Sequence, residues 1–382
     1  MAERPPIAKS CVLDFQARFR QSPALVSWAP GRVNLIGGHT DYNEGLALPS
    51  AINRWVCVAI RPRTDDKVTI RSIDFRAEVS GTLASLPTPT SPWERMVIGC
   101  IDIFGLRHTL PSGFDAVFRG DVPDGAGLSS SAAVSVAWMN ALRAWTGVSI
   151  EDAKLAQMCQ EVEHRYLGVQ CGLLDQMASL MSREQHVMLL DFRDLSAKYV
   201  ALGFDDVEWV VLHSGVRREV AKSGYWLRVE ECTSGLAAHA QARDGVSHFR
   251  DIELSWLGDE VFDRRLRHVI TENARVEAAA QCVADGRSAD LGRLLFEAHT
   301  SLRDDFQVSC DQLDTLVELA AEDLSCMGAR MVGAGFGGCT LNLVKAGQSR
   351  SFMDRVMGAY RQRFDETPRG YSFELVGGAG VD

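Results

Sequence analysis

The chain has 382 residues, of which 46% are hydrophobic and 24% are charged, and its formal net charge is −10. This length favours two domains, and the composition is that of a globular protein with large cores. No basic stretch offsets the negative charge, which argues against a nucleic-acid or anionic-membrane partner. An anionic substrate must then be held locally by backbone amides, a metal ion and single basic residues.

Neither a signal peptide nor a transmembrane helix is predicted. Residues 1–10 contain no apolar core of signal-peptide length, and no apolar run approaches the roughly 18 residues needed to span a membrane. The 10 cysteines are scattered, without a C-x-x-C pair or a Cys/His cluster at zinc spacing. We therefore expect reduced thiols and a cytoplasmic protein.

The first half of the chain predicts strands followed by helices. Residues 24–60 alternate short apolar runs with glycine and proline, a pattern typical of strands in a mixed α and β domain. Residues 82–92 are rich in Pro, Ser and Thr and predict an exposed connection. Residues 131–145 predict a buried helix, and residues 151–167 predict an amphipathic helix with Ser149 as its N-cap.

The second half predicts a more helical domain. Strands are expected at residues 187–191 and 207–212, and helices at residues 217–241, 264–283, 291–296 and 313–324. Residues 329–332 and 340–344 predict two paired strands around a glycine turn. We place the domain boundary near residue 200, because the sequence after residue 217 predicts mainly helices, in contrast to the strands and helices that come before it.

A polar, glycine-rich segment follows the first apolar run. Residues 29–43 read APGRVNLIGGHTDYN. A hydrophobic core has little use for so many polar groups, whereas a loop that binds a small hydroxylated molecule needs a donor or acceptor for each hydroxyl. We interpret this segment as such a loop.

A second glycine-rich segment precedes the predicted buried helix. Residues 123–133 read PDGAGLSSSAA, which is not a Walker A sequence. Glycines let the backbone approach an anion, a helix start offers free N–H groups, and serine hydroxyls suit phosphate oxygens or Mg²⁺. Taken alone, the segment is as consistent with a plain glycine turn followed by a serine N-cap as with a phosphate-binding loop.

A third glycine-rich segment lies between the two predicted strands. Gly333, Gly335 and Gly338 satisfy the pattern G-x-G-x-x-G. A dinucleotide site requires this pattern to open a helix, but the β-branched and apolar residues 340–344 follow it. We therefore reject a dinucleotide site, and a glycine hairpin that only packs is an alternative.

Together the three segments resemble galactokinases, which belong to the GHMP family of small-molecule kinases. The resemblance spans residues 29–339, and the run from Gly172 to Gln176, GLLDQ, is similar to galactokinases in particular. It implies an α+β fold with two lobes. Residues 1–200 would form a sugar- and phosphate-binding lobe of the ribosomal-protein-S5-like type, and residues 201–382 a ferredoxin-like GHMP kinase lobe.

The resemblance also implies an activity and a site. The implied reaction is ATP-dependent phosphorylation of the anomeric hydroxyl of D-galactose, with Mg²⁺ as a further cofactor. Asp175 aligns with the family's catalytic carboxylate, and Arg32 is the candidate cation beside it, because an unpaired buried carboxylate is costly. Sugar binding is implied for Gly38, His39, Asp41, Gly172 and Tyr225. Phosphate binding is implied for Gly125, Ala126, Gly127, Leu128, Ser129, Ser130, Ser131 and Gly335, and Mg²⁺ binding for Ser131 and Glu163.

One position departs from the galactokinase pattern. Gly38 stands where galactokinases usually have a glutamate that helps to hold the C6 hydroxyl of galactose. One alternative is therefore a related sugar 1-kinase for L-arabinose or another galactose-like sugar; another is that a different residue or a water replaces the glutamate. A non-catalytic galactose and ATP sensor is disfavoured because the run SSSAA at residues 129–133 is complete. We expect a monomer whose partners are ATP and a small sugar.

Overall fold

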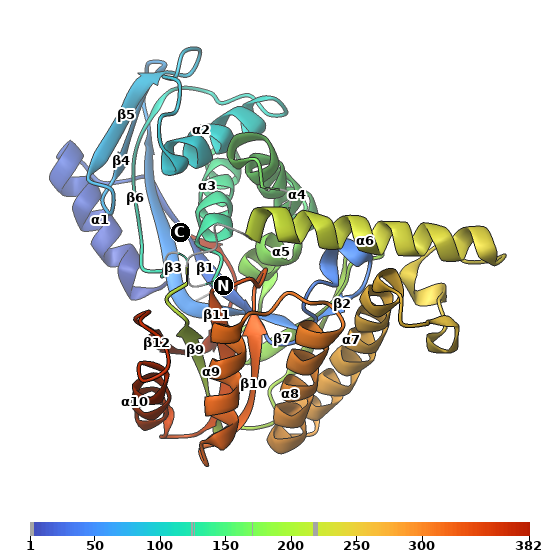
Figure 1. Ribbon diagram of the computed structural model, residues 1–382. Helices are drawn as coiled ribbons and strands as arrows, with labels where there is room; N and C mark the ends of the chain where they lie inside the picture. Colours follow the sequence, from blue (N-terminus) through green and yellow to red (C-terminus); the bar gives the residue numbers. More distant parts are fainter. Residues whose placement is uncertain (1–3, 124, 126, 170, 217–220) are drawn as a thin grey trace.

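The computed structural model describes residues 4–123, 125, 127–169, 171–216 and 221–382, and within them the strands form three sheets (Figure 1). The largest sheet has the order β14-β1-β3-β6-β4-β5, with β13 paired to β3. Its strands are β1 (Leu25–Asn34), β3 (Pro49–Pro62), β4 (Lys67–Ser72), β5 (Ala77–Thr82), β6 (Phe114–Gly120), β13 (Leu375–Val376) and β14 (Gly380–Val381). Strands are thus confirmed within residues 24–60.

Helices cover both faces of this sheet. Alternate residues of β3 face opposite ways: Cys57 packs with α1 (Pro6–Phe19), whereas Val56 and Val58 pack with α2 (Pro92–Gly105) and α3 (Ser130–Thr146). α4 (Asp152–Val162) and α5 (Leu174–Met181) complete the second face. The predicted buried helix is α3, and nearly all of its middle residues are buried.

The helix predicted for residues 151–167 differs from α4 at both ends. α4 begins at Asp152 with Glu151 as its N-cap, so the prediction of Ser149 is wrong. Glu151 has the extended backbone of a cap residue, and the acidic Asp152 in the first turn suits the positive end of the helix dipole. After Val162 the chain continues as a single π-helical turn, Glu163–Leu167.

The second half contains a four-stranded antiparallel sheet of order β10-β11-β9-β12. Its strands are β9 (Val207–His213), β10 (Cys326–Val332), β11 (Cys339–Lys345) and β12 (Arg369–Phe373). The predicted pairing of residues 329–332 with 340–344 is confirmed, since Val332 lies opposite Cys339 and Ala329 opposite Asn342. α9 (Asp311–Glu322) and α10 (Ser349–Tyr360) pack on one face, and α8 (Ser288–Asp304) packs on the other. This strand order is the ferredoxin-like one.

The remaining elements lie beside the two larger sheets. A small sheet joins β2 (Leu46–Ala47), β7 (His186–Asp191) and β8 (Ser196–Ala201), and α7 (Val261–Ala284) packs against it. The long α6 (Ala221–Ala242) runs from the centre of the molecule to its edge (Figure 1). The first four residues of the helix predicted at 217–241 lie outside the described residues. The helix predicted at residues 291–296 is wrong in length, because α8 continues past the polar His299 and Ser301, which are buried.

Two further features concern the whole chain. Within the described residues, no helix is both long and apolar enough to cross a membrane. The end of the chain returns to the first sheet, where Gly380 lies opposite Trp28 of β1. The division into lobes at residue 200 stays a proposal.

Candidate active site

A cavity of about 410 Å³ lies where β1, the start of α3, the start of α5, α6 and the loop after β10 meet. All described residues assigned above to sugar, phosphate or metal binding line it, with the exception of Gly335. Gly333 and Ala334 of the same loop line the cavity instead. Gly335 has a φ of 80°, and an added Cβ would lie 2.1 Å from the Val308 carbonyl oxygen, so its place is close backbone packing. Ala126 lies outside the described residues.

Arg32 and Asp175 form an ion pair at the centre of the cavity. A bulge in β1 between Pro30 and Arg32 lets Gly31 approach the loop before α3, where an added Cβ on Gly31 would lie 2.8 Å from the Leu128 carbonyl oxygen. Arg32 Nε and Nη2 lie 2.7 and 2.5 Å from Asp175 Oδ1. The cation expected beside Asp175 is therefore the one found there.

Both members of this pair also contact the loop before α3. Arg32 Nη1 donates to the Gly127 carbonyl oxygen at 2.7 Å, and the Ser129 hydroxyl donates to Asp175 Oδ2. Gly127 and Ser129 have left-handed backbones, with φ of 70° and 56°, and α3 begins at Ser130. The loop thus carries the N–H groups at the start of α3 next to the ion pair, as an anion site requires.

Glu163 and Ser131 form the acidic end of the cavity. The π-helical turn after α4 carries Glu163, which is buried and accepts hydrogen bonds from Ser131 and, at 3.0 Å, from Gln176. Burial, together with the charge of Asp175, raises the pKa of Glu163 to about 7. A cation bound beside Glu163 would stabilise the charged form of this buried carboxylate. The described residues contain no cluster of three or more His, Cys, Asp or Glu side chains that would bind a metal alone.

Aromatic and acidic side chains line the opposite wall. His39 Nδ1 lies 2.7 Å from the Tyr42 hydroxyl, and Tyr225 of α6 packs against both rings. Burial lowers the pKa of His39 to about 3, so the ring is neutral. Within the described part of the chain its buried Nε2 has no hydrogen-bond partner.

Asp41 lies against Gly172 in this wall. An added Cβ on Gly172 would lie 1.8 Å from Asp41 Oδ2, so only glycine leaves room for the carboxylate. Burial and the nearby Asp175 raise the pKa of Asp41 to about 6. Asp41 is therefore an ionised hydrogen-bond acceptor at neutral pH, and it loses that charge in mild acid.

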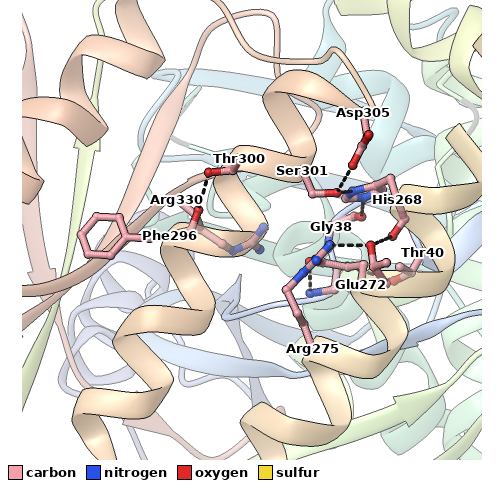
Figure 2. A network of polar contacts seen from close by, with 12 residues as sticks. Gly38, Thr40, His268, Glu272, Arg275, Phe296, Thr300, Ser301, Asp305 and Arg330 are labelled. Carbon is pink, nitrogen blue, oxygen red and sulfur yellow. Dashed lines mark hydrogen bonds and ion pairs between the residues drawn. The ribbon is translucent and has the colours of Figure 1, made fainter. Parts of the chain in front are cut away.

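Arg330 of β10 is a cavity residue that the sequence reasoning missed. The side chain is 1% exposed and donates from Nε to the Leu35 carbonyl oxygen and from Nη2 to the Asn34 carbonyl oxygen, at 2.8 and 2.7 Å. Figure 2 shows it beside Gly38 and the polar residues of α7 and α8. The signal in the sequence was an arginine inside an otherwise apolar strand, because a buried charge in such a place needs a reason.

Comparison with known proteins identifies the family. Residues 13–62 match the galactokinase galactose-binding signature, and residues 95–183 and 277–357 match the N-terminal and C-terminal domains of GHMP kinases. The chain is 38% identical to the galactokinase of Roseiflexus sp. (strain RS-1) over 375 residues, which cover 96% of this chain and 95% of the relative. The chain belongs to the galactokinase family. The galactokinase of Canis lupus familiaris is 37% identical in an alignment of 398 residues, gaps included, which covers 100% of this chain and 99% of that one.

Solved structures agree with membership of the galactokinase family. The structure of Lactococcus lactis galactokinase complexed with galactose has a TM-score of 0.90 at 28% identity, and the match covers 98% of this chain and 99% of that one. A mevalonate kinase structure has a TM-score of 0.64 at 17% identity and shares the fold. The predicted two-lobed α+β GHMP kinase fold is confirmed, and the chain is a sugar-kinase phosphotransferase of the galactokinase type.

Proposed function

We propose that this galactokinase-family enzyme transfers the γ-phosphoryl group of ATP to the anomeric hydroxyl of D-galactose, giving galactose 1-phosphate and ADP. The observation that carries the proposal is the position of the Arg32–Asp175 pair in the cavity. The pair lies between the glycine-rich loop before α3, which suits phosphate, and the polar wall of His39, Asp41 and Tyr225, which suits a sugar. The named relatives favour galactose over L-arabinose or a sensor role.

Asp175 is the residue that handles the hydroxyl proton in this mechanism. Asp175 Oδ1 is engaged by Arg32, while among the described residues Oδ2 accepts from the Ser129 hydroxyl, which a sugar hydroxyl can replace. Oδ2 then accepts or orients the anomeric proton as the oxygen attacks the γ-phosphorus. Arg32 pairs with Asp175 and opposes the charge that develops on the transferring group.

The phosphate loop and the acidic end of the cavity suit ATP with Mg²⁺. Backbone N–H groups from Gly125 to Ser131 would hold phosphate oxygens, and Ser131 and Glu163 would hold the metal. Mg²⁺ usually takes one or two protein ligands together with phosphate oxygens and waters, which fits a site of two side chains. When bound, Mg²⁺ supplies positive charge to the phosphate oxygens.

The opposite wall would bind the sugar. Asp41 is a charged acceptor for ring hydroxyls, neutral His39 offers a ring nitrogen, and Tyr225 closes the wall from α6. Each buried polar group that matches a hydroxyl also rejects a sugar that lacks it.

A sugar panel in a coupled ADP-release assay tests this function. We expect ADP release that depends on D-galactose, and little release with D-glucose, the C4 epimer. Binding of galactose and ATP without ADP release would identify a sensor instead, and comparable rates with both epimers would refute recognition of galactose.

The metal site makes a separate prediction. Ser131→Ala and Glu163→Gln should each raise the Mg²⁺ concentration for half-maximal rate by about tenfold or more, because each removes an oxygen ligand. The matched control is Glu161→Gln, because Glu161 lies two residues before Glu163, near the end of α4, and pairs with Arg107 and Arg165. Magnesium titrations of Ser131→Ala and Glu163→Gln that overlay the parent curve would show that the metal binds elsewhere.

Asp41 should give the enzyme an acid limb in its pH profile. An acid whose pKa is raised to about 6 is ionised above that pH and protonated below it. We expect kcat/KM for galactose to fall about tenfold per pH unit below pH 6, as Asp41 loses its charge. Measurements of kcat/KM at saturating Mg²⁺, which keeps Glu163 ionised, should show between pH 5 and pH 8 that Asp41→Asn has a lower plateau and no limb near pH 6. An unchanged limb in Asp41→Asn would assign the titration to another group.

We infer in addition that the enzyme is a monomer that acts in the cytoplasm. Supporting the location, the described residues contain no disulfide, and seven of the 10 cysteines are buried. Size-exclusion chromatography coupled to light scattering tests the monomer directly.

A further inference from the structure

Gly38 has no side chain, and the Arg330 guanidinium lies next to it in the wall of the cavity that would bind the sugar. The φ of Gly38 lies outside the left-handed region, so no backbone strain requires glycine there. An added Cβ would lie 3.1 Å from Arg330 Nη1 and 3.3 Å from Leu302 Cδ2. Gly38 and Arg330 both line the cavity. Arg330 thus occupies the direction in which a side chain at position 38 would point.

The other cations around Gly38 already have carboxylate partners. Glu272 of α7 pairs with Arg275 at 2.7 Å and accepts the N–H groups of Gly37 and Gly38 (Figure 2). In the same region Asp305 lies 3.7 Å from Arg267, and Asp175 pairs with Arg32. Arg330 donates to two backbone carbonyls, and its Nη1 has no assigned acceptor in the described part of the chain. Burial lowers the pKa of Arg330 to about 10, so the group stays charged at neutral pH.

Glu272 is the carboxylate whose charge acts on Arg330, and it is already engaged by Arg275 and by the backbone N–H groups of Gly37 and Gly38. His268 Nε2 lies 2.9 Å from the Gly38 carbonyl oxygen and occupies it. His39 Nε2 is buried and unpartnered among the described residues, and it carries a proton in the tautomer in which Nδ1 accepts from Tyr42. The unpartnered Oδ1 of Asn34 is an acceptor in the same wall and can serve a neutral hydroxyl. A guanidinium and an imidazole N–H together form the donor set that binds a carboxylate.

We propose that Gly38, His39 and Arg330 form a carboxylate subsite, and that the enzyme phosphorylates D-galacturonate, the C6 acid of galactose, as well as D-galactose. The inference rests on the proposed function and on the galactokinase pattern, in which the residue at position 38 helps to hold the C6 hydroxyl of galactose. A glutamate at position 38 would neutralise Arg330 and repel this substrate. Glycine leaves the charge of Arg330 to the substrate.

The chemical step is the one proposed for galactose. The anomeric oxygen forms the new bond to the γ-phosphorus, and the bond from that phosphorus to the β-phosphate oxygen breaks. ADP leaves, and the hydroxyl proton passes to Asp175. The C6 carboxylate takes no part in the step and serves only to hold the sugar.

The test compares two substrates in three proteins. ADP release and product are measured with D-galactose and D-galacturonate for the parent, Gly38→Glu and Gly38→Gln. The two variants add side chains of nearly the same size, and only glutamate adds charge. In the parent we expect kcat/KM for galacturonate within about tenfold of that for galactose, because a charge-assisted pair replaces a neutral hydrogen bond. The galacturonate-to-galactose ratio of kcat/KM should fall about 100-fold in Gly38→Glu and only a few-fold in Gly38→Gln, because juxtaposed like charges repel.

Three results would overturn the subsite. The first is a parent that phosphorylates galactose but neither phosphorylates galacturonate nor is inhibited by it. The second is an equal fall of the ratio in both variants, which would mean that only space matters. The third is a rise of KM for ATP confined to Gly38→Glu, which would assign Arg330 to a nucleotide phosphate. If neither variant folds, the parent comparison alone decides. A parent inactive on galactose would instead refute the proposed function.

Discussion

Asp175→Asn is expected to lower kcat for D-galactose by about 10²–10⁴-fold, the usual contribution of a general base. The amide keeps the shape of the side chain, but it cannot take a proton and no longer carries the charge that Arg32 neutralises. Because Asp175 is near the surface of the cavity rather than in the core, the variant should fold. Steady-state kinetics with a thermal melt measures both effects.

The chain offers a matched control for Asp175→Asn. Asp191 is also a partly exposed aspartate that pairs with an arginine, since its oxygens lie 2.6 and 2.7 Å from Arg250, but it does not line the cavity. Asp191→Asn should change kcat little. If kcat of Asp175→Asn stays within a few-fold of the parent, Asp175 has no part in proton transfer.

Arg32→Met should be the second most damaging substitution, with a fall in kcat of about 10²–10³-fold, typical for loss of one transition-state donor. The guanidinium contacts Asp175 through two nitrogens and the Gly127 carbonyl through the third, so its loss leaves the Ser129 hydroxyl as the remaining described link between the carboxylate and the loop before α3. Arg32→Lys keeps the positive charge but loses the planar guanidinium that contacts Asp175 through two nitrogens. Its kcat should therefore lie between that of Arg32→Met and that of the parent.

The double variant separates a shared role from two independent ones. If Arg32 acts through Asp175, combining Arg32→Met with Asp175→Asn should cost little more than the worse single change, because groups that act as a unit are not additive. Multiplicative losses in kcat would contradict this coupling.

Much of this site could be predicted because its loops need backbone conformations that favour particular residue types, above all glycine. Gly125 and Gly127 have positive φ before a helix start, and the paired strands around residues 333–338 needed glycines with positive φ. Local chemistry of this kind is visible in one short segment. The Arg32–Asp175 pair was predictable because a half-buried carboxylate needs a cation and the family motifs supplied both residues.

The rest depends on tertiary packing that short segments do not encode. The π-helical turn that carries Glu163 and the length of α8 follow from contacts with other elements. The N-cap was misplaced at Ser149 because a serine before a periodic run is a preference, not a requirement. Arg330 was missed because its neighbours, Gly38 and Glu272, lie far away in the sequence.

The position of the phosphate in the product tests the central claim most directly. The parent enzyme is incubated with ATP, Mg²⁺ and D-galactose, and the product is examined by phosphorus and proton NMR. The account predicts a single new phosphate ester, coupled to the anomeric proton, in amounts equal to the ADP formed. A phosphate ester at any other carbon, or ADP formed without a sugar phosphate, would contradict it.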